Sequence, residues 1–266
     1  MKIIVEPTAE LISQKAALRV ADYIRENPGK LLCFSAGNTP KTMLRELVEM
    51  QYKAEIDLNR MYFAALDEWV GVGADTSGSC AQIMLDNFYG PAGIDPARCL
   101  LWDGTTEDMD AECARMERWI KDRGGIGLAV LGVGPDGRIG FNMPGGTADA
   151  RCHVAELNLE TREAGRGYFE GVTAPVKGFT IGMKRLLAAE RVHLLALGAE
   201  KAQSMRRALM GEPDPQCPAS LLQTHENYRV FVDRALFTAL AVEETPRFQA
   251  NENYRVFIDR DLFTTL

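Results

Sequence analysis

The sequence feature that most constrains the fold is a short apolar run followed at once by a glycine-rich turn. Residues 128–131 (Leu-Ala-Val-Leu) have the pattern of a strand buried on both faces of a parallel sheet. The turn over residues 132–146 carries one acid, Asp136, and one base, Arg138. Open α/β sheets bind ligands at the carboxyl ends of their strands, so this turn is a candidate wall of a binding site. Its glycines are equally compatible with a tight connection that binds nothing.

Strand and helix patterns alternate along most of the chain, and no internal stretch has the composition of a domain linker. This alternation predicts an α/β fold with a mostly parallel, doubly wound sheet and flanking helices in a single domain. Further strands are expected at 2–6, 31–35, 61–66, 99–102, 153–159, 179–182, 192–197 and 228–232. Helices are expected at 8–26, 41–50, 80–89, 106–123, 201–210 and 234–240.

Composition narrows the classes of function. The net charge of -7 and the pI near 5.2 argue against a nucleic-acid surface or an anionic membrane as partner. The apolar runs are too short to span a membrane, and Glu6 and Glu10 break any signal-peptide pattern. Six scattered cysteines without a Cys-x-x-Cys motif indicate reduced thiols. We therefore expect a cytoplasmic protein.

Metal and cofactor signals are missing from the sequence. The three histidines, His153, His193 and His225, have no metal-ligand spacing to the cysteines or carboxylates. No Gly-Lys-Ser/Thr sequence follows a glycine-rich loop, as it would in a nucleotide-binding P-loop. We expect neither a metal nor a cofactor.

The C-terminal part contains an internal repeat. Residues 226–240 recur at 252–266 with three differences in fifteen positions, which leaves twelve identities. The second copy is either a spare strand that competes with or swaps for the first, or a local duplication lying outside the core; we favour the duplication. The chain is accordingly divided into a domain over residues 1–240 and an extension over residues 241–266.

Three segments carry residues suited to chemistry. Residues 35–40 (Ser-Ala-Gly-Asn-Thr-Pro) join a strand to a helix that Thr39 is expected to cap, and such a turn either binds a phosphate or simply connects the elements. Asp67 follows a strand and is placed either as a general base or as a surface acid. Lys201, Arg162 and Arg166 are either phosphate ligands or solvated charges.

The order of these motifs resembles that of the glucosamine-6-phosphate deaminases, most closely the galactosamine-6-phosphate deaminase/isomerase branch. The likeness runs from the first strand to about Leu240, and the 6-phosphogluconolactonases share the fold and much of the pattern. It rests on the motifs at 34–40 (Phe-Ser-Ala-Gly-Asn-Thr-Pro), 66–69 (Leu-Asp-Glu-Trp), 131–137 (Leu-Gly-Val-Gly-Pro-Asp-Gly), 141–144 (Phe-Asn-Met-Pro), 197–201 (Leu-Gly-Ala-Glu-Lys) and 218–222 (Pro-Ala-Ser-Leu-Leu).

The resemblance implies a modified Rossmann-like sheet and an isomerisation with loss of ammonia. A 2-amino-2-deoxyhexose 6-phosphate would be converted to a ketohexose 6-phosphate. Asp67 would move the proton between C2 and C1, and Asp136 would be the acid of a proton relay. Contacts to substrate and phosphate would come from Ser35, Gly37, Asn38, Thr39, Arg166 and Lys201, although Arg166 is one residue out of register. The family also includes homo-oligomers.

Two positions depart from the family pattern. Arg138 stands where the family has the histidine that opens the sugar ring, and Met143 stands where its deaminases have a glutamate. Arginine keeps its proton and cannot act as an acid/base, a loss that typically costs on the order of 10²–10⁴-fold in rate. Three hypotheses follow: a deaminase that takes open-chain substrate, a hydrolase or isomerase of a more acidic phosphosugar, or a sugar-phosphate-binding protein without turnover.

Overall fold

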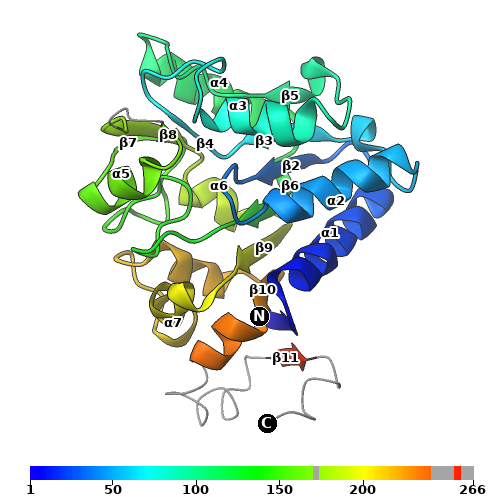
Figure 1. Ribbon diagram of the computed structural model, residues 1–266. Coiled ribbons are helices and arrows are strands. Elements are labelled where there is room, and N and C mark those ends of the chain that lie inside the picture. The colour runs from blue at the N-terminus through cyan, green and yellow to red at the C-terminus, as the bar shows by residue number, and fades with distance from the viewer. Residues whose placement is uncertain (170–173, 241–254, 259–266) are drawn as a thin grey trace.

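Eight parallel strands form the main sheet of the computed structural model, which describes residues 1–169, 174–240 and 255–258 (Figure 1). The strand order is β11-β1-β10-β9-β6-β2-β3-β5. This confirms the predicted doubly wound parallel sheet. The strands are β1 (Lys2–Glu6), β2 (Leu31–Phe34), β3 (Tyr62–Ala65), β5 (Cys99–Leu100), β6 (Ile126–Leu131), β9 (Arg191–Ala196), β10 (Tyr228–Asp233) and β11 (Arg255–Ile258).

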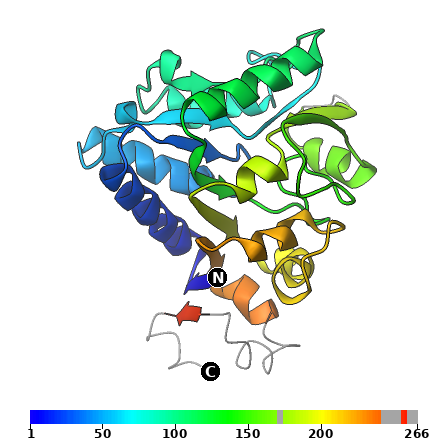
Figure 2. The ribbon, with the colours of Figure 1, turned by 180° about the vertical axis from the view of Figure 1, so that it is seen from behind.

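Helices cover both faces of this sheet (Figures 1 and 2). One face packs against α1 (Ala9–Glu26), α2 (Lys41–Tyr52) and α3 (Cys80–Met84), which continues into a π-helical turn at Leu85–Tyr89. The other face packs against α4 (Met109–Asp122), α6 (Met183–Leu187), α7 (Ala202–Met210) and the helix at 234–240. The remaining helix is α5 (Leu159–Gly165), and short 3-10 turns lie at Leu58–Arg60, Pro96–Arg98, Ala199–Lys201 and Pro218–Thr224. Within the described segments, no helix is long and apolar enough to span a membrane.

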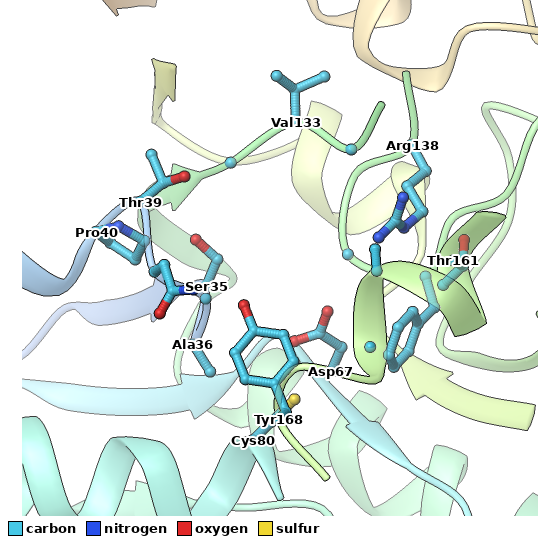
Figure 3. Close-up of a pocket in the computed structure, with 18 of the residues that line it drawn as sticks. Ser35, Ala36, Thr39, Pro40, Asp67, Cys80, Val133, Arg138, Thr161 and Tyr168 are labelled. Carbon is cyan, nitrogen blue, oxygen red and sulfur yellow. The ribbon is translucent and has the colours of Figure 1, made fainter. Parts of the chain in front are cut away.

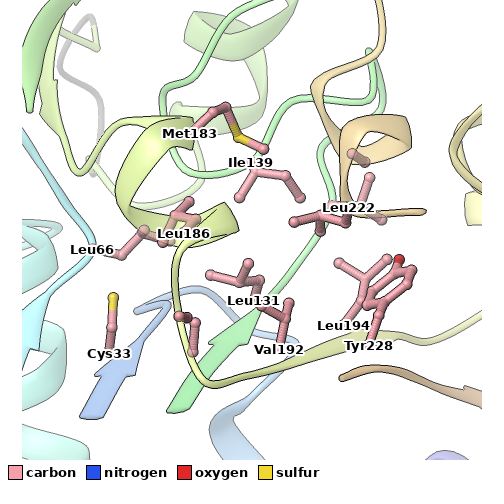
Figure 4. Close-up of a cluster of buried hydrophobic side chains, with 14 of the residues drawn as sticks. Cys33, Leu66, Leu131, Ile139, Met183, Leu186, Val192, Leu194, Leu222 and Tyr228 are labelled. Carbon is pink, nitrogen blue, oxygen red and sulfur yellow. The ribbon is translucent and has the colours of Figure 1, made fainter. Parts of the chain in front are cut away.

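Strand β6 shows why the central run is apolar throughout. All six of its residues are buried. Leu128 and Val130 pack on the α1/α2 side, whereas Ala129 and Leu131 pack on the opposite side. Figure 4 shows Leu131 in this second cluster with Leu194 of β9. A strand covered on both faces has no polar position, so its sequence shows no alternation.

A second sheet was not predicted. It is antiparallel, with the order β4-β8-β7, formed by β4 (Asp67–Trp69), β8 (Lys177–Thr180) and β7 (His153–Glu156). The sequence placed residues 67–69 in a loop, because three residues are too few to show a period. The pairing of Asp67 with Thr180 holds this segment as an extended continuation of β3.

Part of the second copy of the repeated segment pairs with the main sheet. Residues 255–258 of the second copy form β11, which pairs with the outer edge of β1. The rest of the extension, residues 241–254 and 259–266, lies outside the described residues.

Candidate active site

A pocket of about 500 Å³ opens at the carboxyl ends of β2, β6 and β9 and beside β4 (Figure 3). This volume is in the range of small-molecule sites. In Figure 3, Ser35 and Thr39 lie on one side of the pocket, Arg138 and Thr161 lie on the other, and Asp67 lies between them. The lining residues used below are Gly37, Asn38, Thr39, Asp67, Cys80, Arg138, Tyr168 and Lys201.

The segment from Ser35 to Pro40 lines one side of this pocket, as expected for the predicted phosphate loop. The Ser35 amide donates to the Val130 carbonyl at 3.1 Å, which ties the loop to β6. The prediction that Thr39 caps the next helix is wrong, because α2 begins at Lys41 and the flanking residue is Pro40, whose side chain forms no cap. The Thr39 hydroxyl therefore does not cap α2. The N-terminus of α2 lies at the pocket, where its free amides can bind an anion.

Asp67 begins β4 and lines the pocket at its centre. Burial, and after it the charge of Glu68, raises the pKa of Asp67 to about 7. The charge of Arg138 and a hydrogen bond from the Cys80 thiol act in the opposite direction. A carboxylate with a pKa near neutrality can accept a proton and return it at physiological pH.

Glu68, the residue after Asp67 in β4, is buried and fully hydrogen-bonded. It is 1% exposed, and its two oxygens accept four hydrogen bonds at 2.7–3.0 Å. The donors are the Ser79 hydroxyl and the amides of Trp69, Cys80 and Ala81. Burial raises the pKa of Glu68, and the four hydrogen bonds to its oxygens act in the opposite direction. They also join β4 to the start of α3.

Gly140 provides the space for the Asp67 carboxyl group. A Cβ atom at Gly140 would lie 3.3 Å from Asp67 Oδ2 and 2.9 Å from Thr180 Oγ1. Gly140 also has a φ of +55°, in the left-handed region that favours glycine. The glycine-rich turn after β6 therefore approaches the carboxylate closely.

Arg138 is fixed in this same turn. Its Nη1 donates to Asp136 Oδ1 at 3.0 Å, and the side chain is only 14% exposed. Asn158 donates to the other oxygen of Asp136 at 3.0 Å. Burial acts to raise the pKa of Asp136, but the Arg138 charge and these hydrogen bonds hold it below the usual value. The guanidinium passes over Gly134, where a Cβ would collide with it.

Lys201 is the second cation that lines the pocket. It ends the 3-10 turn Ala199–Lys201 after β9, and its Nζ donates to the Val133 carbonyl at 3.0 Å. Burial, followed by the nearby charge of Arg138, lowers the pKa of Lys201. The turn is held by Asp233, whose Oδ2 accepts from the Gly198 amide at 3.0 Å.

The structure does not bring every predicted residue into the pocket. Asp136 lies behind Arg138 and acts on the site through it. Arg166 is not among the lining residues; its side chain is 65% exposed and pairs with Glu163 at 3.5 Å. Met143 accepts a contact of 3.9 Å from the Thr161 hydroxyl at its sulfur and supplies no charge.

Cys80 and Tyr168 are among the lining residues that the sequence analysis missed. The Cys80 thiol hydrogen-bonds to Asp67, and its pKa is raised well above the usual value, first by burial. The Tyr168 hydroxyl lies beside the predicted phosphate loop: a Cβ atom added at Gly37 would be 3.6 Å from it. No local pattern distinguishes Cys80 from the other scattered cysteines, because its contact with Asp67 depends on the packing of the start of α3 against β4.

Within the described segments, no group of His, Cys, Asp and Glu side chains is arranged to hold a metal ion. All six cysteines, each of which is described, carry free thiols. The pocket is lined by two carboxylates, Asp67 and Glu200, by two cations, Arg138 and Lys201, and by a loop of backbone amides.

Comparison with known proteins identifies the family of this chain. The model for glucosamine-6-phosphate isomerases/6-phosphogluconolactonase matches residues 6–231. The chain belongs to this family. Glucosamine-6-phosphate deaminase of Halothermothrix orenii is 36% identical over 88% of this chain and 98% of its own length. Glucosamine-6-phosphate deaminase 1 of Bacillus subtilis is 34% identical over 88% of this chain and 97% of its own length.

Solved structures agree with this assignment. A monomeric glucosamine-6-phosphate deaminase superposes with a TM-score of 0.86 and 33% identity, covering 90% of this chain and all of that one. The 6-phosphogluconolactonase of Trypanosoma brucei has a TM-score of 0.70 at 20% identity, over 90% of this chain and 98% of that one, and shares the fold. The predicted resemblance is confirmed, and the protein is an enzyme of the deaminase family.

Proposed function

We propose that the protein converts a 2-amino-2-deoxyhexose 6-phosphate to a ketohexose 6-phosphate and ammonia, with Asp67 as the base. The observation that carries the proposal is the position of Asp67, whose pKa is about 7, between the 35–40 loop and Arg138. The deaminases among the relatives support the substrate class.

The phosphate would bind the amides of the 35–40 loop and the Lys201 ammonium. This places the carbonyl end of the sugar toward Arg138, with C1 and C2 over Asp67. Asp67 takes the proton from C2 of the open-chain aldehyde, and the electron pair moves to O1. The Arg138 guanidinium then stabilises the negative charge that develops on O1.

The remaining proton transfers need no acid other than protonated Asp67 and the substrate ammonium group. O1 gains a proton from the substrate ammonium group, and Asp67 returns its proton to C1. The nitrogen is left as an iminium at C2, which water attacks to give the ketone and ammonia. Ring opening receives no acid/base help from Arg138, since arginine keeps its proton. The open-chain form is therefore the substrate in this proposal.

A second candidate is hydrolysis or isomerisation of a phosphosugar that carries a further acid group. The observation that favours it is the fixed cation, Arg138, on the side of the pocket opposite the 35–40 loop. A carboxylate or lactone at the end remote from the phosphate would contact this guanidinium.

One experiment separates the candidates. The protein is incubated with glucosamine 6-phosphate, galactosamine 6-phosphate and 6-phosphogluconolactone, and ammonia, ketose phosphate and lactone hydrolysis are measured. Ammonia release that is lost in Asp67→Asn and kept in Asp110→Asn, an exposed acid on α4, supports the deaminase. Lactone hydrolysis alone supports the second candidate. Thermal stabilisation by these ligands without turnover of any of them contradicts both and indicates a binding protein.

A further inference from the structure

Strand β10, from the first copy of the repeated segment, and strand β11, from the second, lie on opposite sides of β1 (Figure 1). The first copy supplies β10, which is placed between β1 and β9. The second copy supplies β11 at the outer edge. Both pair with β1 in parallel and in equivalent register, so that Lys2 is opposite Arg229 on one side and Arg255 on the other.

Only one of the three differences between the copies falls at a position that is buried in the first copy, and that change is conservative. Two of the three changes, Ala235 to Asp261 and Ala239 to Thr265, fall where the first copy is exposed or half-buried. The third, Val232 to Ile258, adds one methylene. The other six buried positions of the first copy have the same residue in the second copy: Tyr228, Val230, Phe231, Asp233, Leu236 and Leu240. The second copy therefore keeps the side chains required at the interior position.

The second copy also has the residues that correspond to the polar contacts of Asp233 in the first copy. Asp233 accepts from the Gly198 amide at 3.0 Å and from the Leu236 amide at 2.8 Å. These bonds join the strand to the turn before Lys201 and to the helix at 234–240. The second copy has Asp259 and Leu262 at the same offsets.

We propose that the two copies are interchangeable within one chain: residues 252–266 can take the interior position between β1 and β9 while residues 226–240 move to the outer edge. Strands are 4.7–4.9 Å apart, so the two positions beside β1 are about 10 Å apart. The three residues from Glu226 to Tyr228 span about 10 Å when extended. Equivalent registers leave the residue pairings along β1 unchanged by the exchange.

The test uses four full-length chains: wild type, Phe231→Asp, Phe257→Asp and the double variant. Phe231 is fully buried, and a carboxylate cannot be accommodated there, but an edge strand tolerates a charge. We expect Phe231→Asp to keep a cooperative thermal transition because the second copy takes the interior position. Phe257→Asp should resemble wild type, and the double variant should lose the transition.

Hydrogen exchange identifies the copy in the interior position, because Val232 and Ile258 give peptides of different mass. In the mild variant Phe231→Ala, amide protection should decrease over residues 228–233 and increase over 254–259. Loss of the transition in Phe231→Asp as in the double variant would overturn the proposal. Protection that stays on residues 228–233 in Phe231→Ala, or a folded Phe231→Asp that occurs only as a dimer, would also overturn it.

Discussion

The pH dependence of turnover tests whether Asp67 is the base. Burial and the adjacent Glu68 charge raise the pKa of Asp67 to about 7. A base acts as the carboxylate, so kcat/KM should rise with pH up to about 7 and level off above it. At pH 6 about a tenth of the enzyme is ionised at Asp67, and kcat/KM should be about tenfold below its plateau.

The substitution Glu68→Gln removes the charge that contributes most, after burial, to the raised pKa of Asp67. The pKa of Asp67 should fall, and a neighbouring carboxylate accounts for a shift on the order of one pH unit, or about 1.4 kcal/mol. The acid limb should therefore move to about pH 6. At that pH the variant would keep about half of its plateau value, whereas wild type keeps about a tenth.

The assay is ammonia release from pH 5.5 to 8.5 at constant ionic strength. The phosphate of the substrate titrates near pH 6, but it does so equally with both enzymes, so the difference between profiles reports the protein. A glutamine cannot accept all four hydrogen bonds of Glu68, which should lower the free energy of unfolding by about 1–3 kcal/mol.

Glu112→Gln is the matched control for that loss of stability. Glu112 is a buried acid on α4 that accepts from the Asp103 amide and from Arg115, and it does not line the pocket. Its substitution should reduce stability and leave the acid limb in place. If the Glu68→Gln and wild-type profiles coincide, or if wild type shows no acid limb between pH 6 and 8, Asp67 does not control turnover by its ionisation.

Three further predictions concern the turn after β6 and the core. Gly134→Ala leaves an unstrained backbone but displaces the Arg138 guanidinium, so kcat should fall on the order of 10- to 100-fold with little change in Tm; an unchanged kcat would exclude a role for Arg138. Arg138→His with Met143→Glu should increase ammonia release on the order of 10²–10⁴-fold if proton shuttling limits turnover, and an unchanged rate would exclude that limit. His193, whose pKa burial lowers to about 3, has no hydrogen-bond partner among the described residues. The unfolded chain therefore binds the extra proton below pH 6.5, and the contribution of His193 to the free energy of unfolding should fall by about 2.5 kcal/mol between pH 7 and 4.5. The raised pKa of Asp67 acts in the opposite direction over this range, so the loss is measured in urea unfolding as the difference between wild type and His193→Leu, and an equal pH dependence of the two would contradict the assignment.

The parts of the site that the sequence predicted depend on local signals. The buried run of β6, the loop after β2 and the acid after β3 are each encoded within a few residues. The small antiparallel sheet was not predictable, because Asp67 pairs with Thr180, which is distant in sequence. Tyr168 and Arg166 show the same limit: they are two residues apart in a polar segment, and only the first lines the pocket. Which of the two faces the site depends on packing between distant segments, which a local pattern does not contain.

The pair formed by Asp136 and Arg138 has a consequence for the form of the pH profile. Both groups stay charged from pH 6 to 8, because arginine keeps its proton and the pKa of Asp136 is held below its usual value. A histidine at position 138 would add a second titration to the site in that interval. With arginine there, this wall of the pocket contributes a constant electric field, and Asp67 is left to carry the proton. The proposed mechanism therefore requires a single acid limb from the protein, with no descending limb from the Asp136–Arg138 pair.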